Sequence, residues 1–533
     1  MPWNEATALA RIKKHVAEAP KFEVQRFEEY RQLYETREVA FAAAMESITP
    51  PLFSLPKNQA VVVDTVQIYI AITNYDEYRL EEGVETEASH DRAMRLLHLY
   101  YSTADRVIEN SSAQRVDFHS GRVHAVVLEQ GNEGVTRETL AEAFAFIEDF
   151  QKVAVAANRE LGRSEFDANF RIGVDVGTCV AINNGTGDEQ EPMFLGGAAN
   201  HAAKLAAGEE SGVYVSDRVR KILGHAEEGV SLEFLSLSEG DVAVNSARRS
   251  PEGDLVFGEQ SREEFTDRIV ANWRNEIYKG DLPDVTDASF SFFYQHPPLS
   301  EIDYAKLSPS HSIRMALVSL FADLSGYTNY VDDAVQKGAI RDVVRALFVI
   351  RQEFQNVVED DFGGRKVRFI GDCIHAVIAE GSDTETNERN SVATATMCAG
   401  GLHKSFALCK SVLDDLDSLG LAVGLELGQT PISRIGIRGD RSVRIASSVA
   451  TTRSEQMQRE CEENRVKIGP SALRVAPAAL EDILDEAGYT AEPDYDEITV
   501  CLSAAPATVA NPTYARAHVP SSSEQPRAHL KFE

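Results

Sequence analysis

Two stretches of this chain repeat one pattern, and only the second stretch carries the acidic residues. In the C-terminal half one apolar run reaches Asp323, and a later apolar run reaches Asp372. The N-terminal half repeats the order of these runs, but Ala71 and Gly121 stand at the corresponding places. A repeated order of element types within one chain indicates a duplicated fold. The sequence therefore predicts two copies of one fold, of which only one has kept a pair of carboxylates.

Length, charge and cysteine usage bound the class of protein. The chain has 533 residues, more than one hydrophobic core usually serves, so two domains with additions are expected. A net charge of −31 argues against broad nucleic-acid binding through a basic face. No apolar run is long enough to span a membrane, and the start does not resemble a signal peptide. The six cysteines form no C-x-x-C pair, so a reduced, cytoplasmic protein is expected.

The order of strand-like and helix-like segments predicts the domain boundaries. Apolar residues at helical spacing predict a helical segment over 1–55. Strand-like and helix-like runs alternate over 56–245 and again over 313–502, which predicts two domains. Turn signals around one helical piece predict a connector over 246–312. The residues 503–533 are rich in Ala, Pro and Ser and are expected to be disordered.

Within the two alternating regions, strands and helices are expected in similar order. The expected strands cover 61–73, 114–128, 170–182 and 212–216, and then 314–324, 366–379 and 420–427. The expected helices cover 90–108, 137–161 and 198–207, then 333–358, 388–417 and 446–463, with 263–278 in the connector.

Four motifs carry a resemblance to a known family. The runs Phe-Ala-Asp323-Leu-Ser-Gly-Tyr-Thr and Phe-Ile-Gly-Asp372 resemble the two metal-binding motifs of the class III adenylate and guanylate cyclases. The run Phe170–Gly177 is similar to that family's R-I-G-x-x-x-G strand, and Leu195–Leu205 resembles its G-D-x-V-N-x-A-x-R helix. The resemblance covers about 60–225 and 313–470, well over half of the chain.

The resemblance implies an α+β fold, with two ferredoxin-like cyclase domains in tandem forming an intramolecular pseudo-heterodimer. In this family each active site draws residues from both partners of a head-to-tail dimer. The second half would supply the metal-binding carboxylates, and the first half Asn200 and Lys204, which share one face of a helix because they lie four residues apart. The pseudo-symmetric site is expected to be inactive, with Arg444 and Ser448 at the positions of the family's Asn and Arg.

The chemistry of cyclisation explains why these residue types are needed. The ribose 3′-oxygen attacks the α-phosphorus and pyrophosphate leaves, and two divalent ions activate the hydroxyl and neutralise the leaving oxygens. The resemblance assigns two Mg²⁺ or Mn²⁺ ions to Asp323, Asp372 and the backbone carbonyl of Leu324. It assigns orientation of the ribose to Asn200 and stabilisation of charge on the pentavalent phosphorus to Lys204.

The sequence departs from the family where the base is read. Adenylate cyclases typically place Lys and Asp at the positions that here are Asp117 and Met193, and Tyr327 is expected to narrow the pocket toward a single ring. Lys204 stands where the family usually has an arginine, so the planar guanidinium group with its forked donors is absent. Gly197 replaces the aspartate of the helix motif. In lacking the residues that read a purine, the chain resembles the bacterial Pycsar cyclases, which make cyclic UMP or cyclic CMP in anti-phage defence.

The leading hypothesis is a nucleotidyl cyclase that converts a nucleoside triphosphate to a 3′,5′-cyclic pyrimidine nucleotide, with cyclic AMP as the alternative product. The resemblance implies a separate effector that binds the product, and it leaves homo-oligomerisation open. A catalytically silent nucleotide-binding regulator is a second hypothesis, which Lys204 in place of arginine favours. An interaction scaffold is a third, against which Asp323 and Asp372 argue.

Structural roles compete with the functional ones at single positions. An aspartate at a strand end is more often a turn or helix-cap residue than a metal ligand. A methionine flanked by Pro192 and Phe194 is more often part of a core. The histidines show no spacing typical of zinc ligands. A basic cluster either contacts the triphosphate or is merely solvated: Arg434, Arg438, Arg441 and Arg444.

Overall fold

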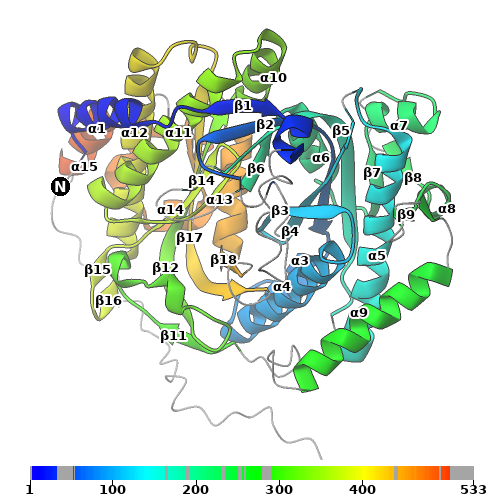
Figure 1. Cartoon of the computed structure of the whole chain (residues 1–533). Coiled ribbons are helices and arrows are strands. Elements are labelled where there is room, and N and C mark those ends of the chain that lie inside the picture. The colour runs from blue at the N-terminus through cyan, green and yellow to red at the C-terminus, as the bar shows by residue number, and fades with distance from the viewer. Residues whose placement is uncertain are drawn as a thin grey trace, which may run out of the picture.

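The computed structural model describes residues 3–32, 52, 55–131, 133–161, 166–183, 185, 192–229, 235–249, 255–256, 260–278, 290–436, 442–461, 464–490 and 494–504. Each half of the chain forms one large mixed sheet flanked by helices (Figure 1). The α+β class expected from the sequence is confirmed. None of the described helices is both long and apolar enough to cross a membrane.

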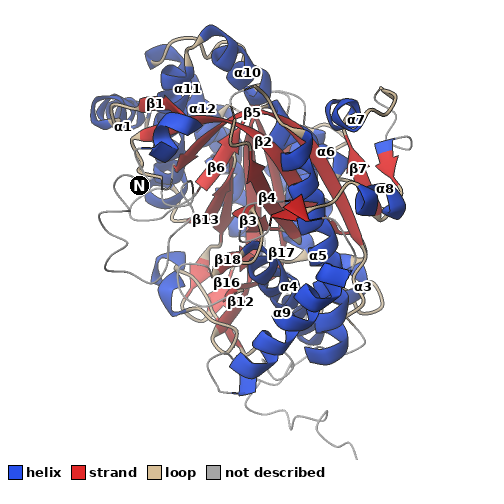
Figure 2. Cartoon of the chain, turned by 45° about the vertical axis from the view of Figure 1, so that its right-hand side comes forward, coloured by secondary structure: helices blue, strands red, loops and turns tan. Residues whose placement is uncertain are grey.

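The sheet of the first half is built on two long antiparallel strands, β2 (Gln59–Ile72) and β5 (Phe170–Asn183). Its order is β3-β4-β2-β5-β7-β8, with β1 paired to β2 and β6 paired to β5. The other strands are β1 (Glu23–Arg26), β3 (Ala113–His119), β4 (Arg122–Leu128), β6 (Pro192–Leu195), β7 (Gly212–Val215) and β8 (Ser236–Leu237). The helices are α3 (Tyr75–Arg79), α4 (Glu87–Ile108), α5 (Arg137–Leu161), α6 (Gly197–Leu205), α7 (Asp217–Leu223) and α8 (Glu239–Val244). Figure 2 shows α4 and α5 with the connector helix α9 (Gln260–Tyr278) on one side of this half.

The sheet of the second half repeats this plan on β12 (Ser312–Ser325) and β17 (Gly420–Ile435). Its order is β13-β14-β12-β17-β18, with β11 paired to β12 and β19 paired to β17. The other strands are β11 (Phe292–Tyr294), β13 (Arg365–Ile370), β14 (Cys373–Ile378), β18 (Val443–Ala446) and β19 (Val466–Ile468). The helices are α10 (Tyr327–Lys337), α11 (Ile340–Asn356), α12 (Glu388–Val412), α13 (Val449–Glu460), α14 (Pro470–Val475) and α15 (Tyr495–Ala504). Short pairs β9 (Arg248–Arg249) with β10 (Leu255–Val256), and β15 (Gly381–Ser382) with β16 (Glu385–Thr386), complete the strands described.

Two glycines fix how the halves correspond. A Cβ at Gly173 would lie 2.1 Å from the backbone oxygen of Ala202 in α6, and a Cβ at Gly424 would lie 2.1 Å from that of Ser454 in α13. Glycine is therefore needed at both positions, because each helix packs directly on the backbone of its sheet. Gly173 corresponds to Gly424, and Ala202 corresponds to Ser454.

Stacked rings beside these glycines extend the correspondence. Tyr69 lies opposite Gly173 and stacks on His124, with 4.0 Å between ring centroids. Phe321 lies opposite Gly424 and stacks on His375 at 4.3 Å. Counting from these rings along the strands, Ala71 corresponds to Asp323 and Gly121 corresponds to Asp372. The structure thus agrees with the alignment of the repeat that the sequence indicates.

Each half contributes a strand to the core of the other half. Met193 and Leu195 of β6 are buried among the core residues of the second half. Val443 and Ile445 of β18 are buried among those of the first half. This reciprocal burial of apolar side chains holds the two sheets together.

The N-terminal segment also bridges the halves. The helix α1 (Glu5–Glu18) packs on α11 and α12 of the second half (Figure 1), while β1 pairs with β2 of the first half. Arg11 of α1 contacts Glu353 at 2.8 Å and Asp361 at 2.7 Å. The expected helical segment over 1–55 is therefore a helix, a strand and helical residues again at 27–32, and most of its later part lies outside the described residues.

Several expected elements are divided differently in the structure. The runs 114–128 and 366–379, each expected as one strand, are hairpins that turn at Gly121 (φ 76°) and Gly371 (φ 61°). The helix expected over 333–358 is broken at Gly338 (φ 73°) into α10 and α11. The helix expected over 446–463 begins only at Val449. The expected disordered tail lies, from 505 on, outside the described residues.

Candidate active site

The two aspartates singled out by the repeat lie side by side. Asp323 lies near the end of β12 and Asp372 lies in the turn between β13 and β14, and their carboxyl groups are within hydrogen-bonding reach of each other. Gln458 of α13 donates from Nε2 to Oδ2 of Asp323 at 3.3 Å. The backbone of Leu324 hydrogen-bonds the carboxyl group of Asp372. The three residues expected to hold metal are thus brought together.

The surroundings of this pair disfavour two negative charges. Desolvation raises the pKa of Asp323 to about 6. Desolvation, and then the charge of Asp323, raise the pKa of Asp372 well above its ordinary value. Both residues keep some solvent exposure. Two adjacent carboxylates that cannot easily ionise together form a set of hard oxygen donors that a divalent cation would neutralise, so the residues present fit Mg²⁺ or Mn²⁺.

The helix α6 of the first half contacts the segment that follows Asp323. Asn200 donates from Nδ2 to the hydroxyl of Thr328, which lies in the first turn of α10. Lys204 is exposed one helical turn further along α6, and none of the hydrogen bonds or ion pairs found among the described residues involves its side chain. Among the described residues, Asn200 therefore hydrogen-bonds to the half that carries the aspartates, and Lys204 does not.

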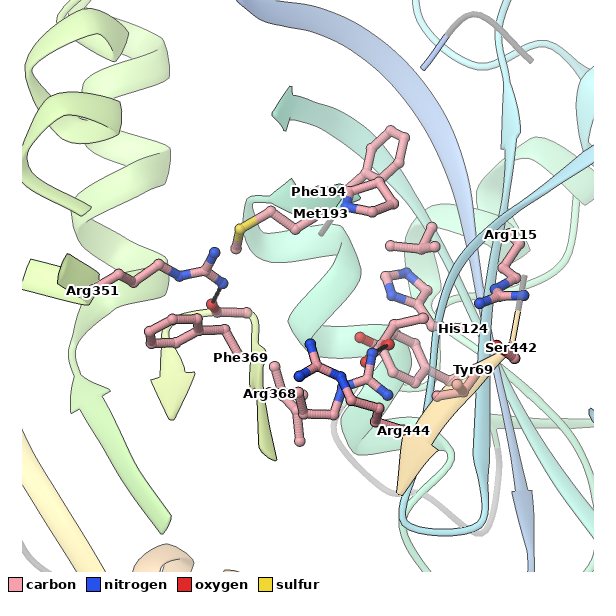
Figure 3. A pocket seen from close by; sticks show the side chains of 16 residues that line it. Tyr69, Arg115, His124, Met193, Phe194, Arg351, Arg368, Phe369, Ser442 and Arg444 are labelled. Carbon is pink, nitrogen blue, oxygen red and sulfur yellow. Dashed lines mark hydrogen bonds and ion pairs between the residues drawn. The ribbon is translucent and has the colours of Figure 1, made fainter. Parts of the chain in front are cut away.

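A cavity of about 140 Å³ is lined by residues of both halves (Figure 3). Gly371, which directly precedes Asp372, is part of its wall. The first half contributes Tyr69, Arg115, Val116, Asp117, His124, Pro192, Met193 and Phe194. The second half contributes Arg351, Arg368, Phe369, Ile370, Gly371, Ser442, Val443 and Arg444.

Two of the three residues expected to read the base line this cavity. Met193 is 5% exposed and stands in its wall, so it belongs both to the core and to the cavity. Asp117 also lines the cavity, and its carboxylate accepts hydrogen bonds from Arg368 and from His119, the latter at 2.8 Å. Burial alone would raise the pKa of Asp117, but Arg368 and His119 outweigh it and hold the pKa well below its usual value. The carboxylate is thus an ionised acceptor already held by a cation.

Tyr327, the third expected base contact, lies elsewhere. Its ring is buried in the core of the second half, 6.0 Å from the ring of Tyr330, and is not among the residues that line the cavity. Its hydroxyl is buried and has no hydrogen-bond partner among the described residues. Burial raises its pKa well above the ordinary value. The expected narrowing of the pocket by Tyr327 is therefore not seen.

Four arginines line the cavity, and the sequence interpretation gave none of them a role in it except Arg444, as part of a basic cluster: Arg115, Arg351, Arg368 and Arg444. Arg351 of α11 donates to the carbonyl of Gly371, and its guanidinium lies 4.5 Å from the ring centroid of Phe369. Arg368 corresponds to Asp117, so the repeat itself pointed to it. Arg444 of β18 is the member of the basic cluster that reaches the cavity, whereas Arg438 and Arg441 lie outside the described residues.

The pseudo-symmetric site corrects one expectation. Asn200 lies two residues before Ala202 and Lys204 two residues after it, so their counterparts around Ser454 are Thr452 and Gln456. Arg444 instead lies in strand β18, and Ser448 is the N-cap of α13. The expectation was wrong because the segment of the second half aligned with the helix motif includes a strand that precedes the helix.

The pseudo-symmetric site is occupied by the protein's own side chains. Arg79 of α3 donates to the hydroxyl of Thr452. Arg122, which follows Gly121, pairs with Glu455 at 2.6 Å. Burial raises the pKa of Glu455, but Arg122 and Arg459 outweigh it and lower the pKa to about 2. An ion pair thus lies beside the position that corresponds to Asp372.

Comparison with known proteins places the chain in a family. No protein-family model matches it. It is 40% identical over 487 residues to a uridylate cyclase from a Rhizobium species, an alignment that covers 90% of this chain and 92% of the relative. It is 35% identical over 460 residues to a uridylate cyclase from Pseudomonas aeruginosa, an alignment that covers 85% of each.

A solved structure also supports membership of a cyclase family. A class III adenylyl cyclase-like ATP-binding protein from Pseudomonas aeruginosa matches with a TM-score of 0.80 and 31% identity, over 94% of this chain and 100% of the other. The shared fold, the adjacent aspartates and the relatives agree with the resemblance seen in the motifs. The protein is a nucleotide cyclase and belongs to the class III cyclase family, together with the two uridylate cyclases.

Proposed function

We propose that the protein converts UTP to 3′,5′-cyclic UMP and pyrophosphate at one composite site per chain. The observation that carries this proposal is the lining of the cavity, which includes Gly371, the residue before Asp372, from the second half and Asp117 and Met193 from the first half. Neither residue reproduces the Lys and Asp pair typical of adenine recognition. The two relatives named uridylate cyclase, at 40% and 35% identity, support uracil as the base.

The carboxylates of Asp323 and Asp372, with the carbonyl of Leu324, would hold two Mg²⁺ or Mn²⁺ ions. Their proximity and raised pKa values support this assignment, because a pair of desolvated acids binds a divalent cation in exchange for its protons. Bound ions of this kind lower the pKa of an attacking hydroxyl and neutralise leaving oxygens.

Asn200 and Lys204 would act on the substrate from the first half. The hydrogen bond from Asn200 to Thr328, five residues after Asp323, supports a place for its amide in the same site as the aspartates. We assign it orientation of the ribose. Lys204 is exposed and one turn away, and we assign it stabilisation of the charge that develops on the phosphorus.

A second candidate has one observation in its favour. The solved structure that matches at 31% identity is named an adenylyl cyclase-like ATP-binding protein. ATP would then be either the substrate or a ligand that is bound without turnover. The role of the product as a defence signal read by a separate effector is a further proposal from the family resemblance, and phage challenge of cells with and without the gene tests it.

Competition among nucleotides separates the candidates. The protein is incubated with Mn²⁺ and equimolar ATP, GTP, CTP and UTP, and the cyclic products are quantified by mass spectrometry. We expect cyclic UMP, with kcat/KM for UTP at least about tenfold above that for ATP or GTP, because a site that fixes one hydrogen-bond pattern rejects other bases. Mostly cyclic AMP would identify an adenylate cyclase, and ATP binding without any product would identify a silent regulator. The Asp372→Ala variant controls for contaminating cyclases.

A further inference from the structure

The first turn of α6 is held by a helix of the opposite half. The backbone N–H of Gly197 donates to Oδ1 of Asp332 at 2.8 Å, and Asn200 donates to the hydroxyl of Thr328. Thr328 and Asp332 lie four residues apart on one face of α10, and Gly197 and Asn200 lie three apart on one face of α6. The two helices thus meet through two hydrogen bonds, one at the proposed ribose contact and one at the helix start.

The start of α6 lacks a cap of its own. Its N-cap residue is Gly196, which has no side chain to accept from the first N–H groups. Gly196 adopts φ 137°, and a Cβ there would lie 3.2 Å from the carbonyl oxygen of Thr178, so the position favours glycine. Unpaired N–H groups at a helix start are costly, and a carboxylate there also interacts favourably with the helix dipole. Asp332 supplies that carboxylate from the other half.

Close packing fits the carboxylate to this place. A Cβ at Gly197 would lie 2.6 Å from Oδ2 of Asp332, so the carboxylate end of that side chain would have to shift. The absence of a side chain at Gly197 therefore lets the carboxylate approach the backbone of α6.

The pseudo-symmetric helix offers a contrast. The N–H of Val449, the counterpart of Gly197, donates to Glu85 of the opposite half at 2.6 Å. However, α13 also has its own cap, because Ser448 accepts from the N–H of Thr451 at 3.1 Å. The carboxylate of Glu85 is therefore added to a cap from the N-cap residue itself, whereas the N-cap residue of α6 offers none and Asp332 accepts from the first N–H of the helix.

We propose that Asp332 is a positioning residue for cyclisation: by capping α6 across the interface, it holds Asn200 in place against the half that carries the aspartates. The inference rests on the proposed role of Asn200 and deepens it. It assigns the placement of Asn200 to the hydrogen bond between Gly197 and Asp332.

Kinetics of three variants test this role. We expect Asp332→Ala to lower kcat about tenfold, the scale of a lost helix cap, with KM for UTP changed less than about twofold. Asp332→Asn should recover most of kcat, since its amide oxygen still accepts from Gly197. Glu85→Ala is the matched control and should change kcat by less than about twofold, because Ser448 still caps α13. Wild-type kcat in Asp332→Ala, or a loss in KM alone, would overturn the proposal.

A second pair of variants tests the contact itself. Gly197→Ala should lower kcat in the wild-type background, because its methyl group collides with Asp332. In the Asp332→Ala background the same substitution should cause little further loss, so the two effects should not add. Additive losses would show that Gly197 and Asp332 act independently and would contradict the proposal.

Hydrogen exchange measured by mass spectrometry gives a readout that does not depend on the substrate. Asp332→Ala should speed exchange of the amides in α6 and leave α13 unchanged, whereas Glu85→Ala should affect neither helix strongly. If wild-type protein makes no cyclic UMP from UTP, the proposed function fails while this measurement still tests the cap. If the protein is active but Asp332→Ala leaves exchange of α6 unchanged, the inference alone fails.

Discussion

Asp117 and Arg368 occupy equivalent positions in the two halves and form an ion pair with each other. Asp117 lies opposite His124 in β3, and Arg368 lies opposite His375 in β13, each just after a bulge. Because equivalent residues of the two halves contact each other, they lie close to the pseudo-twofold axis that relates the halves. In a symmetric dimer of either half, this position would face itself and bring like charges together. Divergence to opposite charges therefore favours pairing of the two different halves within one chain.

This ion pair predicts how stability depends on pH. The folded-state pKa of Asp117 is depressed below its ordinary 3.8, so the pair stabilises the protein above that pH, and the stabilisation is lost as the pH falls through 3.8 and below. The free energy of unfolding should therefore fall less between pH 7 and about pH 3 in Asp117→Asn than in wild type. Urea unfolding at both pH values measures this. Equal losses in both proteins would contradict the assignment.

The metal assignment predicts that Asp323→Ala and Asp372→Ala each abolish turnover while the fold remains, because two-metal chemistry needs both carboxylates. Formation of cyclic nucleotide with Mn²⁺ and circular dichroism measure the two effects. Ala71→Ser, at the position equivalent to Asp323, is the matched control and should keep wild-type activity. Activity within about tenfold of wild type in both aspartate variants would remove the metal role.

The crowded carboxylates predict a gain in stability when one is removed. Without metal, Asp372→Asn should raise the melting temperature, because desolvation and the charge of Asp323 both disfavour ionisation of Asp372. Mn²⁺ should raise the melting temperature of wild type and should do so much less in the variant, since a ligand stabilises only the state that binds it. Thermal unfolding with EDTA and with Mn²⁺ measures both effects. A lower melting temperature of the metal-free variant would contradict the repulsion argument.

The helix α6 predicts a difference between the two pseudo-symmetric sites. Asn200→Ala or Lys204→Ala should lower kcat about a hundredfold or more, with smaller effects on KM, because the contacts proposed for them are made in the transition state. Thr452→Ala and Gln456→Ala are the matched controls in the other half and should have little effect. Arg444 is not a neutral control, since it lines the cavity. Steady-state kinetics with UTP give the ranking, and the reverse order would show that the halves are assigned the wrong way round.

The N-terminal helix predicts a loss of stability on removal of one arginine. Arg11 contacts Glu353, whose side chain has no solvent exposure. Breaking a buried pair from one side typically costs about 3–5 kcal/mol, so Arg11→Ala should lower the free energy of unfolding by an amount of this order. Arg11→Ala combined with Glu353→Gln should be less destabilised, because the amide carries no charge and still accepts from Ser405. Chemical denaturation compares the variants, and equal stability of Arg11→Ala and wild type would argue that α1 is not anchored by this pair.

Local sequence sufficed for the residues that lie in or directly after regular strands. Asp323 and Asp372 follow apolar runs, and the same runs in the first half end at Ala71 and Gly121. Because a strand is recognisable from its own residues, the duplication and the loss of carboxylates from one copy could be read without any long-range contact. The α+β class followed from the same alternation.

The tertiary structure decided what depends on contacts between distant segments. Because α13 begins only after strand β18, Thr452 and Gln456 are the counterparts of Asn200 and Lys204. No local pattern distinguished this alignment from the one that places Arg444 and Ser448 at these positions. Tyr327, the first residue of α10, is buried in the core of the second half, and no local pattern showed this.

The composite site itself joins residues that are far apart in the chain. Asp117 meets Arg368, Arg122 meets Glu455, and Gly197 meets Asp332 only when the halves pack head to tail. Sequence spacing carries information about neighbours within one strand or helix, since periodicity reports which face a residue occupies. It carries none about which residues of the other half will face them, so the partners that complete the site were fixed by the packing of the two sheets alone.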